Sequence, residues 1–439
     1  MGPTADSTST AFEHTTMSQR VLFGTSQAGQ LIAEELDRLD AVRPIIIVSS
    51  SATPHVQSIT DSISPALIWD EVVQHVPRST VEAAAQAAEA AEADAIVAVG
   101  GGSAIGLAKA VARTRGLKTI AVPTTYSGSE ATAIWGTTEA GTKTTGTDSA
   151  VLPAAVVYDA ALSASLPRGL SVVSGLNALA HCVDSLWAPE ADPINQAHAL
   201  AGAREIAAAL RRLVQDPSDM PARERALYGS YLAGLSLASA GSGLHHKLCH
   251  ILGGTFALAH AETHTAVLPH VVALNAPEAP LSASRLAAAL NESATTPRAA
   301  AAETTLPGAA AVRALEHLYD DVGAPRALRD IGFTESNIDE ALPRAVEIVP
   351  ASNPASAGAG ELRRLLHAAL QGARPEMSAH DVQRDLEEEL ITRVLASFEH
   401  SPDPPAQGDS AQRSDAPARR HPRGPDHRGR VAKRCLVSD

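Results

Sequence analysis

The sequence has 439 residues, of which 45% are hydrophobic and only 3% aromatic, and its formal net charge is −14. This length allows two or three domains of about 100–200 residues each, and the acidic balance argues against a general nucleic-acid binder. No apolar run approaches the roughly 18 residues of a membrane-spanning helix, so we expect no membrane span. Three cysteines without a CxxC pair support neither a disulfide framework nor a cysteine-type zinc site, and a reducing cytoplasm fits this usage best.

Short apolar runs alternate with helical stretches between residues 20 and 160. The pattern predicts strands at 20–24, 44–50, 95–99, 118–123 and 155–159, and helices at 26–39, 79–93 and 103–115. Ser26 is expected to cap the first of these helices. Continuous apolar runs such as PIIIV are typical of strands that are buried on both faces. This order predicts a parallel sheet covered by helices.

Beyond about residue 165 the pattern becomes helical throughout. Ala- and Leu-rich stretches predict helices at 171–187, 194–214, 222–240, 243–252 and 263–275. The expected fold class is therefore α/β plus all-α, with a parallel-sheet nucleotide-binding domain followed by a helical domain. We expect a disordered extension at 1–11, a dinucleotide-binding domain at 12–165, a helical catalytic domain at 166–374 and a mostly disordered tail at 375–439.

A glycine turn follows the strand expected at 95–99. Gly100, Gly101 and Gly102 run into Ser103, where a helix is expected to begin. Glycines let the backbone approach a pyrophosphate, and the free N–H groups of a helix start point at it. The spacing is not G-x-G-x-x-G, so this is a related solution rather than the standard dinucleotide fingerprint. The alternative interpretation is a tight turn without a ligand.

A second polar segment follows the next expected strand. Its hydroxyls, on Thr124, Thr125, Ser127 and Ser129, are candidates for contacts to ribose, phosphate or nicotinamide. The alternative is a turn that only caps its own backbone. Two such segments in consecutive strand–helix units favour nucleotide binding.

The end of the strand expected at 44–50 bears on the choice of nucleotide. A carboxylate there would bind the adenosine ribose and repel a 2′-phosphate. Ser50 and its serine neighbours are small and neutral. We therefore expect both NADH and NADPH to be accepted, with Ser50 close to the cofactor.

The helical region concentrates polar side chains at ligand-type spacing. Asn177 and His181 are four residues apart, as are His246 and His250, so each pair shares one helix face. His260, Glu262, His264 and His270 follow. A single helical histidine is usually a surface or core residue, whereas such a cluster can bind a divalent metal, bind carboxylates or donate a proton.

Four separated motifs together resemble the iron-containing alcohol dehydrogenase superfamily, and within it the maleylacetate reductases: GGGSAIGLAKA (100–110), VPTTYSGSEAT (122–132), GLNALAHCVDSLWAPEADP (175–193) and the segment 243–270. The resemblance spans roughly residues 12–374. It implies a nucleotide-binding α/β domain, a helical domain and an active site in the cleft between them.

The resemblance also assigns a set of metal positions. Metal-dependent members use an Asp and three His, which correspond here to Asn177, His181, His246 and His260, while His250 matches a position near the substrate and nicotinamide. The departure is Asn177, because an amide is a weaker ligand than a carboxylate. We therefore expect no required metal, and we take His181, His246, His250 and His260 as the catalytic candidates.

The resemblance implies NADH- or NADPH-dependent reduction of the carbon–carbon double bond of maleylacetate to 3-oxoadipate, in a homodimer that acts on a small dicarboxylate. The main alternative is a metal-dependent alcohol dehydrogenase of the same superfamily. A lyase of the dehydroquinate-synthase type would call for more Lys and Arg around the cleft. An inactive fusion product is a remote alternative.

The end of the chain has a second resemblance. Residues 385–404 are similar to the start of hydroxyquinol-type intradiol dioxygenases, and the following residues have the bias of a GC-rich gene read in a shifted frame. The tail is thus either a fused remnant of a ring-cleavage gene or an ordinary disordered tail.

Overall fold

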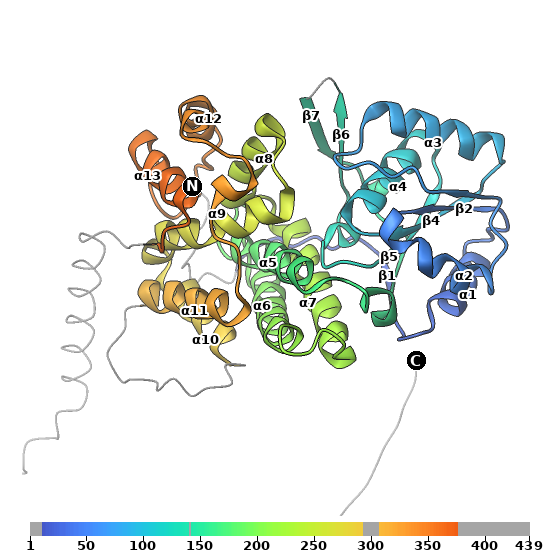
Figure 1. The fold of residues 1–439 in the computed structure, drawn as a ribbon, viewed down its shortest axis with the longest axis horizontal. Helices are drawn as coiled ribbons and strands as arrows, with labels where there is room; N and C mark the ends of the chain where they lie inside the picture. The colour runs from blue at the N-terminus through green and yellow to red at the C-terminus, as the bar shows by residue number, and fades with distance from the viewer. Residues whose placement is uncertain (1–10, 140–141, 293–306, 376–439) are drawn as a thin grey trace, which may run out of the picture. The chain divides into compact units, whose positions relative to one another are not determined.

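This computed structural model describes residues 11–139, 142–292 and 307–375. Most of the expected N-terminal extension and the expected tail, including the dioxygenase-like segment 385–404, lie outside the described residues. Six parallel strands, on the right of Figure 1, form one sheet. Their order in the sheet is β1-β8-β5-β4-β2-β3. They are β1 (Arg20–Phe23), β2 (Pro44–Val48), β3 (Leu67–Trp69), β4 (Ala95–Gly100), β5 (Lys118–Pro123) and β8 (Ala155–Tyr158).

Helices cover both faces of this sheet because alternate side chains of each strand point to opposite faces. Ile46 and Val48 of β2 pack with α1 (Ala28–Arg38) and α2 (Val56–Thr60). Ile45 and Ile47 pack with α3 (Arg78–Ala90) and α4 (Gly102–Arg115) on the other face. The predicted parallel sheet covered by helices is therefore confirmed.

The predicted cap of the first helix was wrong. Ser26 has a positive φ of 60° and lies outside α1, whose N-cap is Gln27 without a side-chain cap. The carboxylate of Asp159, which directly follows β8, instead accepts the backbone N–H groups of Ser26, Gln27 and Ala28 at 2.7, 3.0 and 3.0 Å. A long-range carboxylate therefore takes the place of the local serine.

Two strand features were absent from the sequence-based prediction. β3 is a short edge strand, and β6 (Ile134–Glu139) pairs with β7 (Thr142–Thr147) in an antiparallel hairpin. The hairpin is rich in Thr and Gly and has few large apolar residues, so it lacks a strong strand signal. The hairpin contacts α3 and α4 through β6, and through β7 it contacts the helix α8, whose bounds follow below.

The second half of the described chain is helical, as predicted. Its helices are α5 (Arg168–Ser185), α6 (Pro193–Leu213), α7 (Met220–Ala240), α8 (Leu244–Phe256), α9 (His260–Asn275), α10 (Pro280–Asn291), α11 (Pro307–Val322), α12 (Glu335–Glu347) and α13 (Ala359–Gln371). α5 is buried along most of its length and contacts α6, α7, α8 and α9. It is therefore the central helix of this region.

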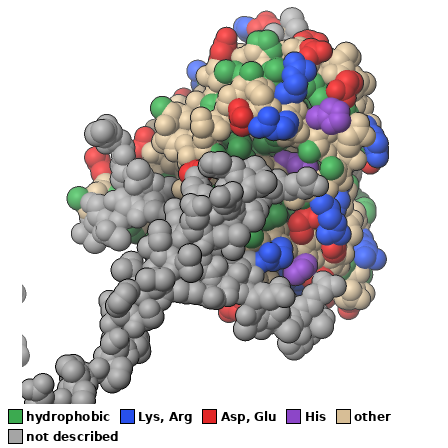
Figure 2. Space-filling view, turned by 90° about the vertical axis from the view of Figure 1, so that its left-hand side faces the viewer, with side chains coloured by type: hydrophobic (Ala, Val, Ile, Leu, Met, Phe, Trp, Pro, Cys, Tyr) green, Lys and Arg blue, Asp and Glu red, His purple; other side chains and the backbone are tan. Residues whose placement is uncertain are grey.

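Below, the sheet lobe means β1 to β8 with α1 to α4, and the helical lobe means α5 to α13. The lobes share a core in which Ala121 and Val156 of the sheet pack with Leu213 and Leu227 of α6 and α7. Within the described residues, no helix is both long and apolar enough to cross a membrane. On the face shown in Figure 2, acidic, basic and apolar side chains are interspersed over the coloured atoms.

Candidate active site

The glycine turn after β4 is closely confined on two sides. Gly100 has a φ of 150°, and a Cβ at this residue would lie 2.5 Å from Ser49 Oγ and 2.9 Å from Ala104 Cβ. A Cβ at Gly101 would lie 3.0 Å from Thr125 Oγ1. The Gly100 carbonyl accepts the Thr124 N–H at 3.0 Å. The ends of β2, β4 and β5 therefore meet at this turn, which leaves no room for a side chain at Gly100.

The N-terminus of α4 differs from that of α1 in the described part of the chain. Its N-cap is Gly101, no side chain caps it, and its first turn contains no acidic residue. The N-terminus of α1, by contrast, is occupied by the Asp159 carboxylate. Helix N-termini attract anions through their unpaired N–H groups and the helix dipole. The start of α4 is thus suited to a phosphate of a bound nucleotide.

Only some of the predicted cofactor residues lie beside the glycine turn. Ser103 lies in the first turn of α4, and Ser127 lies beside Gly102, since a Cβ there would be 3.6 Å from Ser127 Cβ. Ser50 is exposed and begins a short 3-10 helix after β2. Ser129 has its backbone oxygen 2.6 Å from Lys109 Nζ. The turn, Thr125 and Ser127 are therefore brought together, whereas Ser129 serves an internal contact.

The predicted histidines converge from three helices. Ring centroids of His181 on α5 and His246 on α8 are 4.8 Å apart. His250 lies one turn after His246, at 6.3 Å, and its ring stacks at 6.1 Å with that of His260, the first residue of α9. His181 and His246 are buried, His250 is half-buried and His260 is exposed. The solvent exposure of the four candidates thus increases from His181 and His246 in the interior to His260 at the surface, which is called the rim below.

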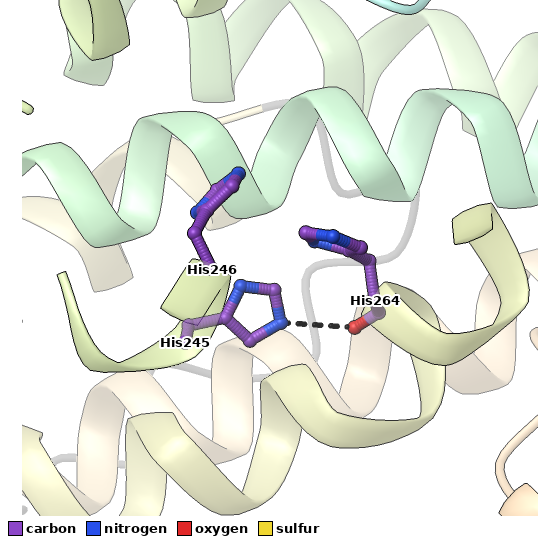
Figure 3. A group of neighbouring side chains, drawn as sticks. All are labelled: His245, His246 and His264. Atoms are coloured by element: carbon purple, nitrogen blue, oxygen red, sulfur yellow. Dashed lines mark hydrogen bonds between the residues drawn. The ribbon is translucent and has the colours of Figure 1, made fainter. Parts of the chain in front are cut away.

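His264 lies at the centre of the cluster, although it was not among the predicted catalytic residues. Its ring centroid is 4.3 Å from that of His260, 4.8 Å from that of His246 and 4.9 Å from that of His245. Ligand-type nitrogens of His245, His246 and His264 lie within 4.8 Å of one another (Figure 3). His245 is anchored through Nε2, 3.1 Å from the backbone oxygen of His264.

Asp184 was also missed, and it orients His246. Its Oδ2 lies 2.9 Å from His246 Nδ1, and its carboxylate also accepts the N–H groups of Gly243, His245 and His246 at 2.8, 3.3 and 3.3 Å. Burial raises the pKa of Asp184, and these N–H groups oppose the rise. A carboxylate that accepts four N–H contacts is best satisfied when ionised, so His246 Nδ1 carries the hydrogen. His246 Nε2, which has no partner among the described residues, then presents a lone pair to the cluster.

The buried rings are neutral at neutral pH. Burial lowers the pKa of His246 to about 3, with the charge of His250 as the second cause. Burial likewise lowers the pKa of His245 to about 4 and that of His181 and His264 well below 6.5. The interior of the cluster thus offers neutral imidazoles with both N–H donors and lone pairs, rather than fixed positive charge.

One loop of the sheet lobe touches this cluster. A Cβ at Gly128, whose φ is 72°, would lie 3.0 Å from His181 Nδ1, and a Cβ at Gly234 of α7 would collide with the Gly128 carbonyl. The same loop is fixed to α5, because the N–H of Tyr126 donates to Ser174 Oγ at 2.9 Å. Thr125 and Ser127, which face the glycine turn, are therefore only a few residues from the contact with His181.

A parallel sheet with a glycine turn at an uncapped helix N-terminus, which one loop connects to a buried histidine cluster on helices, is the arrangement of a two-lobed nucleotide-dependent enzyme. The chain belongs to the iron-containing alcohol dehydrogenase family: residues 18–160 match the model "Iron-containing alcohol dehydrogenase", and residues 171–370 match "Fe-containing alcohol dehydrogenase family, C-terminal".

Among named relatives, the chain is 39% identical over 366 residues to a maleylacetate reductase from Sphingobium indicum, covering 83% of this chain and 99% of that protein. It is 42% identical over 358 residues to maleylacetate reductase 2 from Cupriavidus pinatubonensis, covering 81% and 96%. The structure of maleylacetate reductase from Agrobacterium tumefaciens matches with a TM-score of 0.76 and 36% identity, covering 84% and 100%. The structure of an iron-containing alcohol dehydrogenase from Corynebacterium glutamicum matches with a TM-score of 0.77 and 47% identity, and the match covers 82% of this chain and 97% of that one.

The family name raises the question of whether this site fits iron. Three buried atoms have no hydrogen-bond partner among the described residues, namely Asn177 Oδ1, His181 Nδ1 and His246 Nε2. Such atoms are available to bind a metal. Yet the set of Asn177 and three histidines contains no carboxylate, whereas iron(II) sites with open positions usually combine histidine with a carboxylate. Asp184 already accepts several N–H groups. The donor set therefore lacks the carboxylate that such iron(II) sites usually contain.

Proposed function

We propose that this protein reduces the carbon–carbon double bond of maleylacetate to 3-oxoadipate with NADH or NADPH. The proposal is supported by the maleylacetate reductases that match across most of the chain. The geometric observation that carries it is the contact of Gly128 with His181, which connects the nucleotide turn to the histidine cluster. Hydride leaves the nicotinamide at such a junction and enters a substrate held by the helical lobe.

The chemistry requires stabilisation of an enolate and delivery of one proton. Hydride adds to the double bond conjugated with the ketone, negative charge develops on the ketone oxygen, and a proton then reaches carbon. N–H groups of neutral imidazoles can stabilise that oxygen without a net charge in the buried interior. His246 Nε2 is a lone-pair site, because Asp184 holds the hydrogen on Nδ1.

We assign the remaining candidates by their exposure. His250 and His260 lie at the accessible end of the cluster and are suited to meet the substrate carboxylates. His181 contacts the loop that carries Ser127 and is suited to the reacting end of the substrate. In this arrangement the dicarboxylate extends from the rim towards Gly128.

We propose that no metal is required. The support is the neutral donor set around Asn177, which lacks the carboxylate expected for iron(II). The test is oxidation of NADH by maleylacetate, followed at 340 nm, with enzyme dialysed against a chelator. We expect full activity, and addition of Fe²⁺ or Zn²⁺ should change the rate by less than about twofold.

A metal-dependent alcohol dehydrogenase is the second candidate. It is favoured by the 47% identity to the structure of an iron-containing alcohol dehydrogenase from Corynebacterium glutamicum. It predicts alcohol-dependent reduction of NAD⁺ and loss of activity in the chelator. A chelated enzyme that is inactive until a metal is restored would replace our proposal with this one.

Further parts of the proposal concern the nucleotide, the assembly and the compartment. Ser49, Ser50 and Ser51 carry no negative charge, so we propose that the catalytic efficiencies with NADH and NADPH lie within about tenfold. We propose domain boundaries at 12–165 and 166–374, and the support is that two separate family models match residues 18–160 and 171–370. We also propose a homodimer, which is what the family resemblance implies, and light scattering tests this. We propose the cytoplasm as its compartment, because the chain has few cysteines.

A further inference from the structure

Lys109 of α4 is a buried lysine that the catalytic proposal leaves without a role. Its side chain has no solvent exposure. Its Nζ lies 2.6, 2.7 and 3.0 Å from the backbone oxygens of Ser129, Thr132 and Ile134. It also lies 3.1 Å from Thr132 Oγ1 and 3.4 Å from Ser129 Oγ. The amine therefore sits in a cage of five oxygens that all come from one short segment.

Burying the Lys109 amine in this environment costs free energy. Burial of a lysine removes its hydration, and here it lowers the pKa of Lys109 to about 7, although the charge of Glu130 opposes the fall. An apolar side chain of similar length would fill the same space without that desolvation penalty, but it would leave the backbone oxygens of Ser129, Thr132 and Ile134 without this donor. The oxygen cage is thus better explained by what the cation organises than by stability alone.

The organised segment belongs to the loop between β5 and β6. Glu130, fully buried beside the cage, accepts the Tyr158 hydroxyl at 2.7 Å and the Ser127 hydroxyl at 3.2 Å. Its backbone oxygen accepts the side-chain amide of Gln19 at 2.8 Å. The part of the loop just before the cage contains Ser127, beside Gly102, and Gly128, beside His181. A displacement of the cage would therefore move both contacts.

Lys109 and the glycine turn are parts of one rigid element. Lys109 lies seven residues after Gly102 on α4, about 10 Å along the helix axis. The N-terminus of that helix faces the proposed phosphate, and Lys109 attaches to the loop from the middle of the same helix. The distance between the nucleotide turn and the loop at His181 is thus set through α4.

We propose that Lys109 is a positioning residue that fixes the loop of Ser127 and Gly128 relative to the nucleotide turn, and thereby aligns the hydride donor with the histidine cluster. This inference rests on the proposed nucleotide-dependent reduction. Lys109 itself touches neither substrate nor cofactor in this account. Its effect passes through Ser127 and Gly128.

The test compares Lys109→Met with Arg113→Met. Arg113 lies one turn further along α4, with its guanidinium 4.0 Å from the ring centroid of Trp135 in the β6–β7 hairpin. Both substitutions remove a cation that joins α4 to the following chain, but only the first removes the cage. The dissociation constant for NADH is measured by fluorescence without substrate, and the rate of NADH oxidation is measured in a single turnover with maleylacetate.

For Lys109→Met we expect weaker NADH binding and slower hydride transfer, each by about tenfold or more, because small displacements of reacting groups are costly. Arg113→Met should stay within about twofold in both measurements. If Lys109→Met cannot be obtained folded, Thr132→Val removes one of the five oxygens and should move both quantities in the same direction. Lys109→Met protein, or Thr132→Val in its place, with unchanged NADH affinity and hydride transfer would overturn the inference, whatever its melting temperature.

The outcome is separable from that of the proposed function. NADH binding is measured in the absence of maleylacetate, so it reports on Lys109 even if the substrate is different. Failure of the wild-type protein to oxidise NADH with maleylacetate would reject the proposed reaction. A Lys109→Met effect on NADH affinity would still support its role in organising the nucleotide site.

Discussion

The two lobes prepare their parts of the site by different physical means. The sheet lobe presents backbone N–H groups and hydroxyls around Gly100, Thr125 and Ser127, and the anion binding that we propose for it depends on a helix N-terminus. The helical lobe buries titratable rings and keeps them neutral, as for His246 and His264. The proposed nucleotide binding by the sheet lobe therefore depends on the shape of the backbone. The proposed chemistry of the helical lobe depends on which nitrogen of each histidine ring carries the hydrogen.

This difference separates the consequences of substitutions. A change of shape confined to the glycine turn of the sheet lobe should weaken nucleotide binding and leave the chemistry of bound substrate intact, whereas a change at Lys109, which fixes the loop at His181, should affect both. A change of hydrogen placement in the helical lobe should slow the chemical step and leave nucleotide binding intact. The three predictions below test this separation.

The largest effect is expected for Asp184→Asn. An asparagine can donate to His246 Nδ1, which moves the ring hydrogen to Nε2 and reverses the polarity that the ring shows to the cluster. We expect kcat to fall by about a hundredfold, as for other carboxylates that orient a functional histidine. Affinity for NADH should be unchanged.

The matched control is Asp192→Asn. Asp192 forms the other buried Asp–His pair of this protein's described residues, with His14 Nδ1 2.7 Å from its Oδ2. It caps α6, and asparagine is an equally good cap. Its substitution should leave kcat unchanged. Equal losses of kcat in the two variants would show that Asp184 acts through stability rather than through His246.

A smaller effect is expected for Gly100→Ala in the sheet lobe. The new Cβ would meet Ser49 Oγ and Ala104 Cβ at a φ of 150°. The turn must shift, and we expect the dissociation constant for NADH to rise roughly tenfold, since such local strain is worth about 1–3 kcal/mol. Fluorescence titration with NADH measures this change, and the single-turnover rate at saturating NADH should be nearly unchanged.

Gly116→Ala provides the comparison at the other end of α4. Gly116 also has a positive φ, of 71°, but a Cβ there would meet no atom within 4 Å. It should lower the melting temperature without a change in NADH affinity. A similar loss of affinity in both variants would mean that general destabilisation, not the shape of the turn, controls binding.

The sheet lobe could be predicted well because its signals are local. Apolar runs such as Pro44–Val48 are buried on both faces, and the glycine turn follows its strand directly. The cap of α1 was mispredicted because Asp159 comes from a distant part of the sequence, which no local pattern reveals. The hairpin at 134–147 was missed because Thr and Gly give little apolar alternation.

The histidine cluster was predicted in position but not in detail. His264 follows His260 by four residues, the same spacing that drew attention to His246 and His250, so the sequence contained that signal. Asp184 lies three residues after His181 on the same helix face, which is a weaker signal. The depth of each ring and the partner of each nitrogen depend on the packing of α5, α8 and α9, which spacing along one helix does not determine.

The smallest effect concerns the pH dependence of stability. Burial, followed by the charges of neighbouring histidines, holds the pKa of His264 well below 6.5. Below pH 6.5 the unfolded chain binds a proton at this ring while the native protein does not, so the stability that this ring contributes is complete above about pH 6.5 and is lost as the pH falls. Each such ring should contribute a slope of about 1 kcal/mol per pH unit between pH 6.5 and 5.

The measurement is urea unfolding of the wild type, His264→Asn and His367→Asn at several pH values between 7 and 5. His264→Asn should reduce the slope of the unfolding free energy against pH by about 1 kcal/mol per unit, because asparagine does not titrate. His367 is 54% exposed and lies 3.6 Å from Glu335, so His367→Asn is the control for the removal of one imidazole outside the buried cluster. An unaltered slope in His264→Asn would mean that this ring takes up its proton over the same pH range in the native protein as in the unfolded chain. The histidine cluster would then become positively charged as the pH falls. The two lobes would in that case differ in their charge rather than in which nitrogens carry hydrogens.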